Sequence, residues 1–77
     1  MNPRYHYTNH AREQMEERRI SAAEVEEVLA EPDITLNTRK GVSKTRTIGE
    51  RSIVVVVKEN ATRTNIKIIT VYARGEE

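Results

Sequence analysis

The run IVVVV at residues 53–57 constrains the fold of this chain more than any other feature. Five consecutive β-branched residues favour an extended strand, because branching at Cβ restricts the side chain in a helix. Successive side chains of a strand point to opposite sides, so an unbroken apolar run is buried on both faces of its sheet. The sequence therefore predicts a central strand at about residues 52–58 that has neighbouring strands beside it.

The residues around this run predict the other strands. Polar residues alternate with β-branched residues in three further segments, which is typical of strands. Strands are expected at about residues 34–38, 42–48 and 66–73. Short turn-like connections separate them, which favours antiparallel pairing. Alternation along residues 66–73 predicts that Thr70 and Tyr72 share a face with Ile66 and Ile68. Residues 1–7 form either a short edge strand or an ordered tail.

Two helices are predicted before residue 33. Thr8 and Asn9 are both suitable N-caps for a helix at about residues 9–19. Ser21 and Glu24 have the spacing of a capping box, which predicts a second helix at about residues 22–30. Pro32 ends that helix, because the residue before proline is disfavoured in the helical region.

The chain length limits these elements to one small domain. Residues 1–77 are therefore expected to form a single α+β domain, with two N-terminal helices packed on a three- to four-stranded antiparallel sheet. The sequence has no cysteine and only two histidines, so we expect no metal site and no cofactor. No apolar segment approaches the length that spans a bilayer, and the N-terminus lacks the apolar core of a signal peptide. A cytoplasmic protein without a membrane partner is expected.

Charge is distributed unevenly along the chain. Residues 1–40 hold six Lys or Arg and eight Asp or Glu, whereas residues 41–77 hold seven and four. The helical half is therefore acidic and the strand half basic. A basic sheet suits a phosphate-binding face, although solubility alone also produces such an asymmetry.

The stretch HAREQMEERRISAAEVEEVLAEPD at residues 10–33 resembles a prokaryotic family of domains of unknown function with a His-Ala-x-x-Arg-Met-x-x-Arg helix motif. The matching positions are His10, Ala11, Met15, Arg18, Ile20, Val25, Leu29 and Pro32, followed by Thr70, Val71 and Tyr72 in the last strand. That family is similar to the RelE/ParE-like toxins of the superfamily that includes barnase and the colicin nucleases. The resemblance implies a RelE/barnase-like fold.

The resemblance also implies a metal-independent ribonuclease of a toxin–antitoxin system. Such an enzyme acts on RNA or on the ribosome and is bound by an antitoxin protein. Histidine suits proton transfer near neutral pH, and a cation stabilises the phosphorane. His10 is then the general base or acid, Arg18 and Arg46 are the phosphate-binding cations, and Thr70 or Tyr72 orients the phosphate. Gln14 departs from the motif, since the family has arginine there.

Each of these residues also has a structural interpretation. His10 can cap or pack a helix, and Arg18 can form a salt bridge with Glu17 or Glu24. Lys44 and Arg46 can be charges of a solvated edge strand. The alternative function is a non-catalytic module of the same fold that docks a partner protein or forms a homodimer. A third is nucleic-acid binding without cleavage.

Overall fold

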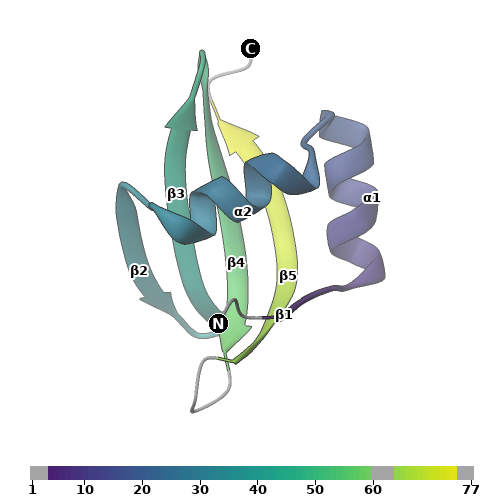
Figure 1. The fold of residues 1–77 in the computed structure, drawn as a ribbon, viewed down its shortest axis with the longest axis vertical. Coiled ribbons are helices and arrows are strands. Elements are labelled where there is room, and N and C mark those ends of the chain that lie inside the picture. The colour runs from purple at the N-terminus through teal and green to yellow at the C-terminus, as the bar shows by residue number, and fades with distance from the viewer. Residues whose placement is uncertain (1–3, 60–63, 75–77) are drawn as a thin grey trace.

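The computed structural model describes residues 4–59 and 64–74. Along the chain a short strand precedes two helices, and four strands follow (Figure 1). The elements are β1 (Arg4–Tyr7), α1 (Asn9–Arg18), α2 (Ala22–Ala30), β2 (Ile34–Thr38), β3 (Gly41–Ile48), β4 (Arg51–Glu59) and β5 (Asn65–Arg74).

The five strands form one mixed sheet in the order β1-β5-β4-β3-β2. β2 to β5 are antiparallel to their neighbours, whereas β1 pairs with β5 in parallel. The predicted fold class, two N-terminal helices on a three- to four-stranded antiparallel sheet, is therefore wrong. The structure begins with a strand at the edge of the sheet, and this strand runs parallel to β5, from which both helices and three strands separate it along the chain.

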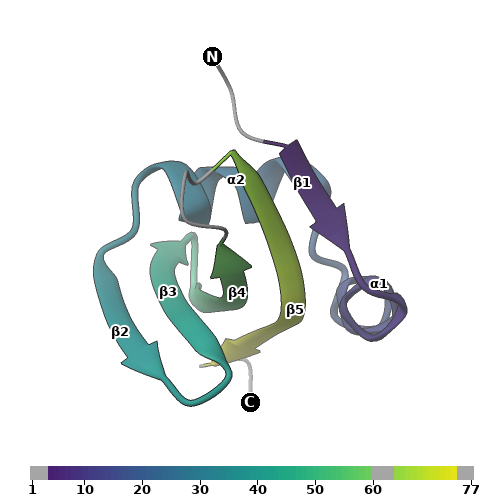
Figure 2. The same ribbon diagram turned by 90° about the horizontal axis from the view of Figure 1, so that it is seen from below.

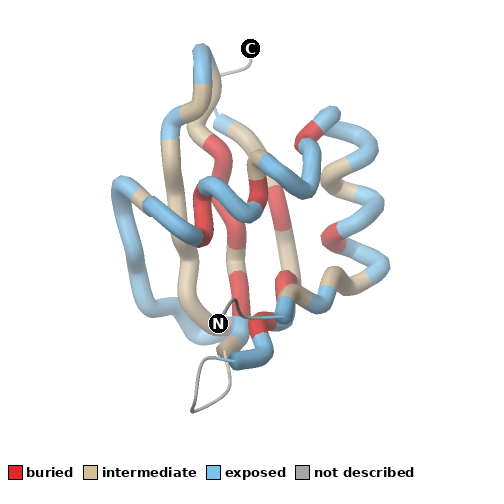
Figure 3. The backbone as a smooth tube through the Cα atoms, viewed as in Figure 1, coloured by how far each residue is buried: buried red, intermediate tan, exposed pale blue. Residues whose placement is uncertain are grey.

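The run at residues 53–57 lies in β4, the middle strand of the sheet, as predicted. Ile53, Val55 and Val57 are fully buried on the face that the helices cover, and on the opposite face Val54 is 2% exposed while Val56 is half-buried. Figure 3 shows the buried residues following the central strands and the inner sides of the helices. The core thus forms between the sheet and α2, with α1 against β5.

Both helices begin at hydroxyl caps. The predicted capping box is confirmed: Ser21 Oγ accepts from the Glu24 amide at 3.1 Å, and Glu24 Oε1 accepts from the Ser21 amide at 2.9 Å. Thr8 caps α1 by accepting from the Ala11 amide at 3.1 Å. Figure 2 shows α2 lying across one face of a curled sheet, while α1 lies beside β5. Neither helix of the described chain is long and apolar enough to cross a bilayer.

A bulge in β5 decides which side chains share a face. Val56 pairs with Thr70 but the next residue, Val57, pairs with Ile68, so Ile69 is an extra residue in β5. The bulge reverses the alternation, and Ile66 and Ile68 point to the core while residues 70 and 72 lie on the other face. The prediction that these four residues share one face is wrong, because strict alternation takes no account of an inserted residue.

Thr8 contacts both carbonyl groups at this bulge. Its amide donates to Ile68 O at 3.2 Å, and its hydroxyl donates to Ile69 O at 3.2 Å. The same hydroxyl accepts from the first turn of α1, at the Ala11 amide. β1 therefore ends, α1 begins and β5 bulges at one point of the fold.

Candidate functional site

The cations on the helix-covered face of the sheet are paired with carboxylates. Lys44 Nζ lies 3.2 Å from Glu59 Oε1. Arg46 Nη1 donates to the Glu31 carbonyl at 2.8 Å, and Arg46 Nε lies 3.5 Å from Glu27 Oε2 without making a hydrogen bond. Arg46 therefore holds the C-terminal end of α2, where a cation complements the free carbonyls.

Arg51 joins the start of β4 to the junction between the helices. Its guanidinium donates to Arg18 O at 2.8 Å and to Arg19 O at 2.9 Å, and it lies 3.2 Å from Glu24 Oε2. Hydrogen bonds to Ser21 and Arg51 hold the pKa of Glu24 below its ordinary value, the Ser21 amide making the largest contribution. Arg19, the residue that ends α1, has left-handed backbone angles. Arg51 thus fixes a tight turn between α1 and α2.

The face of the sheet opposite α2, which we call the open face, carries a strip of hydroxyl groups. Register places Ser43, Thr45 and Thr47 of β3 beside the even-numbered positions of β4, and these in turn beside Thr70 and Tyr72 of β5. Val54 lies in register between Thr45 and Tyr72. Together the hydroxyl strip consists of Ser43, Thr45, Thr47, Ser52, Thr70 and Tyr72.

Tyr72 stands at the centre of a small aromatic and cationic group on this face. Its side chain is half-buried, and the Arg74 guanidinium carbon lies 5.7 Å from the ring centroid. Arg74 Nη2 also donates to the Tyr72 hydroxyl at 3.4 Å. The ring offers a stacking surface with a cation beside it.

At the other end of the open face, three basic side chains stand in one row across three strands. Lys58 of β4 is the register partner of Lys67 of β5, and Lys67 is the register partner of His6 of β1. We call these residues the cation row, after its two lysines. Like charges directly opposite one another destabilise a sheet. The Lys58–Lys67 pair is therefore unfavourable by itself and becomes favourable beside an anion.

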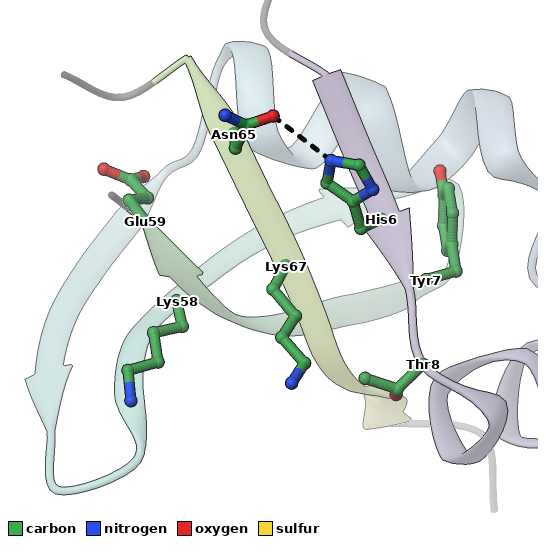
Figure 4. A pocket seen from close by; sticks show the side chains of 7 residues that line it. All are labelled: His6, Tyr7, Thr8, Lys58, Glu59, Asn65 and Lys67. Carbon is green, nitrogen blue, oxygen red and sulfur yellow. Dashed lines mark hydrogen bonds between the residues drawn. The ribbon is translucent and has the colours of Figure 1, made fainter. Parts of the chain in front are cut away.

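The cation row lines a surface hollow of about 460 Å³. The other lining residues are Tyr7, Thr8, Glu59 and Asn65. Figure 4 shows the two lysine amino groups extending in the same direction, while His6 Nε2 is turned toward Asn65 Oδ1 at 3.2 Å. The Glu59 carboxylate in this view lies away from both amino groups, and it bonds Lys44. Burial, with smaller contributions from Glu26 and Tyr5, raises the pKa of Tyr7 above its ordinary value.

No carboxylate of the described strands projects from the open face. Glu59 is the sole acidic residue within β1–β5 as described, and its pairing with Lys44 places it on the helix side. Residues 4–59 and 64–74 contain no carboxylate within ion-pair distance of Lys58 or Lys67. The acidic residues gather instead on the helices, as at the hollow lined by Glu13, Glu16 and Glu17 of α1. The sheet therefore presents one positive face and the helices a negative one.

The structure does not bring the five residues that the resemblance implies as catalytic into one group. His10 is exposed in the first turn of α1, and Arg18 is exposed at its end, where Nε donates to Gln14 Oε1 at 2.9 Å. Arg46 lies under α2 on the helix-covered face. Thr70 and Tyr72 lie together on the open face. These positions do not bring Arg46 together with the two hydroxyl residues.

Sequence reasoning missed the residues that line the hollow. Lys58 and Lys67 border the loop between β4 and β5, and only the bulge at Ile69 brings them into register. From the sequence, His6 is predicted to be a surface residue; it is exposed, and it also lines the hollow. The position of Arg51 beside a tight turn predicts a plain surface residue, and this prediction is wrong, because its side chain is only 16% exposed. The expected bridges from Arg18 to Glu17 or Glu24 are replaced by the bond to Gln14.

Residues 4–59 and 64–74 contain no group of three His, Cys, Asp or Glu side chains placed to share a metal ion. In comparisons with known proteins, the chain matches the DUF4258 family, described as a domain of unknown function, over residues 7–73. No curated protein and no solved structure matches the chain. The matched range contains both helices, the hydroxyl strip and both lysines of the cation row. Similarity to RelE/ParE-like toxins stays a prediction.

Proposed function

We propose that this chain, which belongs to the DUF4258 family of domains of unknown function, binds single-stranded RNA through the open face. The geometry of that face supports the proposal. The observation that carries the proposal is the cation row, in which Lys58, Lys67 and His6 stand side by side. Glu59 lines the same hollow but pairs with Lys44, and no carboxylate of the described residues lies within ion-pair distance of Lys58 or Lys67. A phosphate backbone supplies the negative charge that such a row lacks.

The rest of the open face suits an RNA chain more than an isolated anion. The hydroxyl strip continues from the cation row across β3, β4 and β5, and Tyr72 offers a ring on which a base can stack. Hydroxyl side chains exchange hydrogen bonds with the ribose 2′-OH, the group that distinguishes RNA from DNA. One tyrosine on the described part of this face indicates a short bound segment, since each stacked base needs its own platform.

The proposal concerns binding, because the structure does not bring together the residues that the resemblance implies for cleavage. Arg46 is engaged with α2, while Thr70 and Tyr72 lie on the opposite face of the sheet. A cleavage site needs a proton-transfer group and a cation at the same phosphate. The ribonuclease activity that the resemblance implies stays a prediction, and the His10→Ala variant in a metal-free cleavage assay tests it.

The test of RNA binding is fluorescence anisotropy with a short labelled RNA of mixed sequence, titrated at several salt concentrations. The double variant Lys58→Gln/Lys67→Gln is expected to bind more weakly and to reduce the magnitude of the slope of log affinity against log salt by about 1.4, roughly 0.7 for each single-strand phosphate contact removed. Its matched control is Arg12→Gln/Lys40→Gln, which removes the same charge from α1 and from the turn between β2 and β3.

The control variant is expected to bind RNA almost as the unmodified protein does. Equal losses in both double variants would mean that net charge alone attracts RNA, and the proposal would then be wrong. DNA of the same sequence provides a second comparison. RNA is expected to bind more tightly, since the hydroxyl strip can bond to the 2′-OH.

A second candidate, a protein-binding module, is favoured by one observation. Ile34 and Leu36 of β2 are the exposed large hydrophobic residues of the described chain, at 53% and 59% exposure. They lie on an edge strand, where another chain can add a strand.

A further inference from the structure

β2 is an edge strand without the usual protection against pairing. It bonds only to β3 within the sheet, and all five of its residues are exposed, as the pale segment in Figure 3 shows. Natural edge strands are blunted by charges, proline or bulges. Residues 34–38, ITLNT, contain no charge and no proline, and their register with β3 is regular.

The charged residues lie directly at the two ends of this strand. Asp33 precedes β2 and Arg39 follows it. If a second copy of β2 is placed antiparallel about a two-fold axis at Leu36, residue 33 of one copy meets residue 39 of the other. The same operation pairs residue 34 with residue 38 and residue 35 with residue 37. Asp33 lies in a bend just before β2 and Arg39 begins the turn just after it, so the two side chains come next to each other just beyond the paired strands at both ends.

We propose that two copies of this chain pair through β2, antiparallel and centred on Leu36. The pairing brings the Leu36 side chains together at the axis, and it places Ile34 beside Thr38 of the second copy. Aliphatic and β-branched cross-strand pairs stabilise a sheet. The interface is isologous and the assembly stops at two copies, because the free edge of each β2 is then paired with the other.

The charges select this orientation over the alternative. A parallel, in-register pair places Asp33 beside Asp33 and Arg39 beside Arg39, and like charges in these positions destabilise the pairing. The antiparallel pair replaces both repulsions with attractions. The Oδ2 atom of Asp33 accepts a hydrogen bond from the Thr47 amide at 3.1 Å. A carboxylate has further acceptor sites, so Asp33 can also pair with Arg39 of the second copy.

The interface is short, so the dimer is weak. A pair of five-residue strands falls below the roughly 1,200 Å² of stable interfaces, in the class of transient complexes. We expect a monomer–dimer equilibrium in the micromolar range or weaker. The proposal is independent of RNA binding, although the dimer would join two open faces into one continuous surface.

Analytical ultracentrifugation over a series of protein concentrations tests the proposal. The unmodified protein is expected to shift from monomer to dimer as its concentration rises. Arg39→Asp places aspartates opposite one another at both ends and is expected to abolish the dimer. Lys40→Asp makes the same charge change one residue outside the proposed register and is expected to leave the dimer intact.

A mixing experiment tests the register itself. Asp33→Arg alone is also expected to be monomeric, since it puts arginines opposite one another. When it is mixed with Arg39→Asp, each Asp–Arg contact is restored between unlike chains, so the mixture is expected to form a heterodimer. Circular dichroism of each variant verifies folding, because Asp33 also bonds Thr47.

Leu36→Lys provides a second route if Asp33→Arg fails to fold. Its side chain is 59% exposed, so the fold should tolerate the change, while two lysines at the axis repel each other. A monomer at every concentration of the unmodified protein would overturn the proposal. So would a dimer that Leu36→Lys leaves unchanged, or folded Asp33→Arg and Arg39→Asp variants that do not associate on mixing.

Discussion

Replacing Arg51 with methionine is expected to loosen the junction between α1, α2 and the sheet. Methionine keeps much of the aliphatic volume but removes the hydrogen bonds to Arg18 O and Arg19 O and the ion pair with Glu24. The Arg51 side chain is 16% exposed, so water can replace only some of the hydrogen bonds that the substitution removes. The substitution therefore tests a contact that local sequence patterns do not reveal.

The magnitude follows from the number and type of bonds lost. A hydrogen bond that involves a charged group contributes about 1.5 to 3 kcal/mol, and bonds sharing one side chain do not add fully. The freed carbonyl groups at the end of α1 regain some water, so we expect a loss of about 3 kcal/mol. A chain of this size has a total stability of about 4 to 12 kcal/mol, so the expected loss is a large fraction.

Urea unfolding followed by circular dichroism measures this loss. The midpoint is expected to fall with little change in the slope m, and Tm is expected to fall by about 4–8 °C for each kcal/mol lost. Arg12→Met, on the exposed side of α1, is the matched control and is expected to change stability by no more than about 0.5 kcal/mol. If Arg51→Met costs no more than this control, the inferred role of Arg51 is refuted.

Three further predictions concern the fold around the site. Gly41→Ala is expected to cost about 1–3 kcal/mol in urea unfolding, because Gly41 has φ near +148° and an added Cβ would meet Val57 O. Thr8→Ala, which removes the α1 cap and the bond to Ile69 O, is expected to cost about 1–2 kcal/mol by the same measurement. The lowered pKa of Glu24 means that its charge stabilises the fold above pH 4.5, the ordinary value, and that this contribution disappears as pH falls through the folded-state pKa. Unfolding curves of Glu24→Gln and the unmodified protein should therefore differ at neutral pH and converge in acid; a constant difference would contradict this reasoning.

The helices were the most predictable elements because their signals are local. Ser21 and Glu24 are three residues apart, and the bonds they predict are the bonds observed. Pro32 likewise lies just after the observed end of α2. Such contacts depend on the conformation of a few consecutive residues, so the sequence contains all the information that they need.

The roles of the cations were not predictable in the same way. Arg46 and Lys67 are both strand residues in the basic half of the chain, yet Arg46 bonds α2 while Lys67 lines the hollow on the open face. The sequence identifies a charged residue in a strand, but it does not show to which side of the sheet the side chain points. That side depends on register, which long-range packing sets.

The sequence by itself determined that residues 53–57 form a central strand, buried except at the half-buried Val56, and that a capped helix begins after Ser21, because hydrophobicity and local hydrogen bonding favour both. Tertiary structure alone decided two features. One is the parallel pairing of β1 with β5, which joins segments at opposite ends of the chain. The other is the bulge at Ile69, which turns Ile66 and Ile68 inward and brings Lys67 beside Lys58 on the open face. A bulge moves every side chain on one side of it to the other face, and its position is chosen by how the whole core packs, including the bonds from Thr8 that close it.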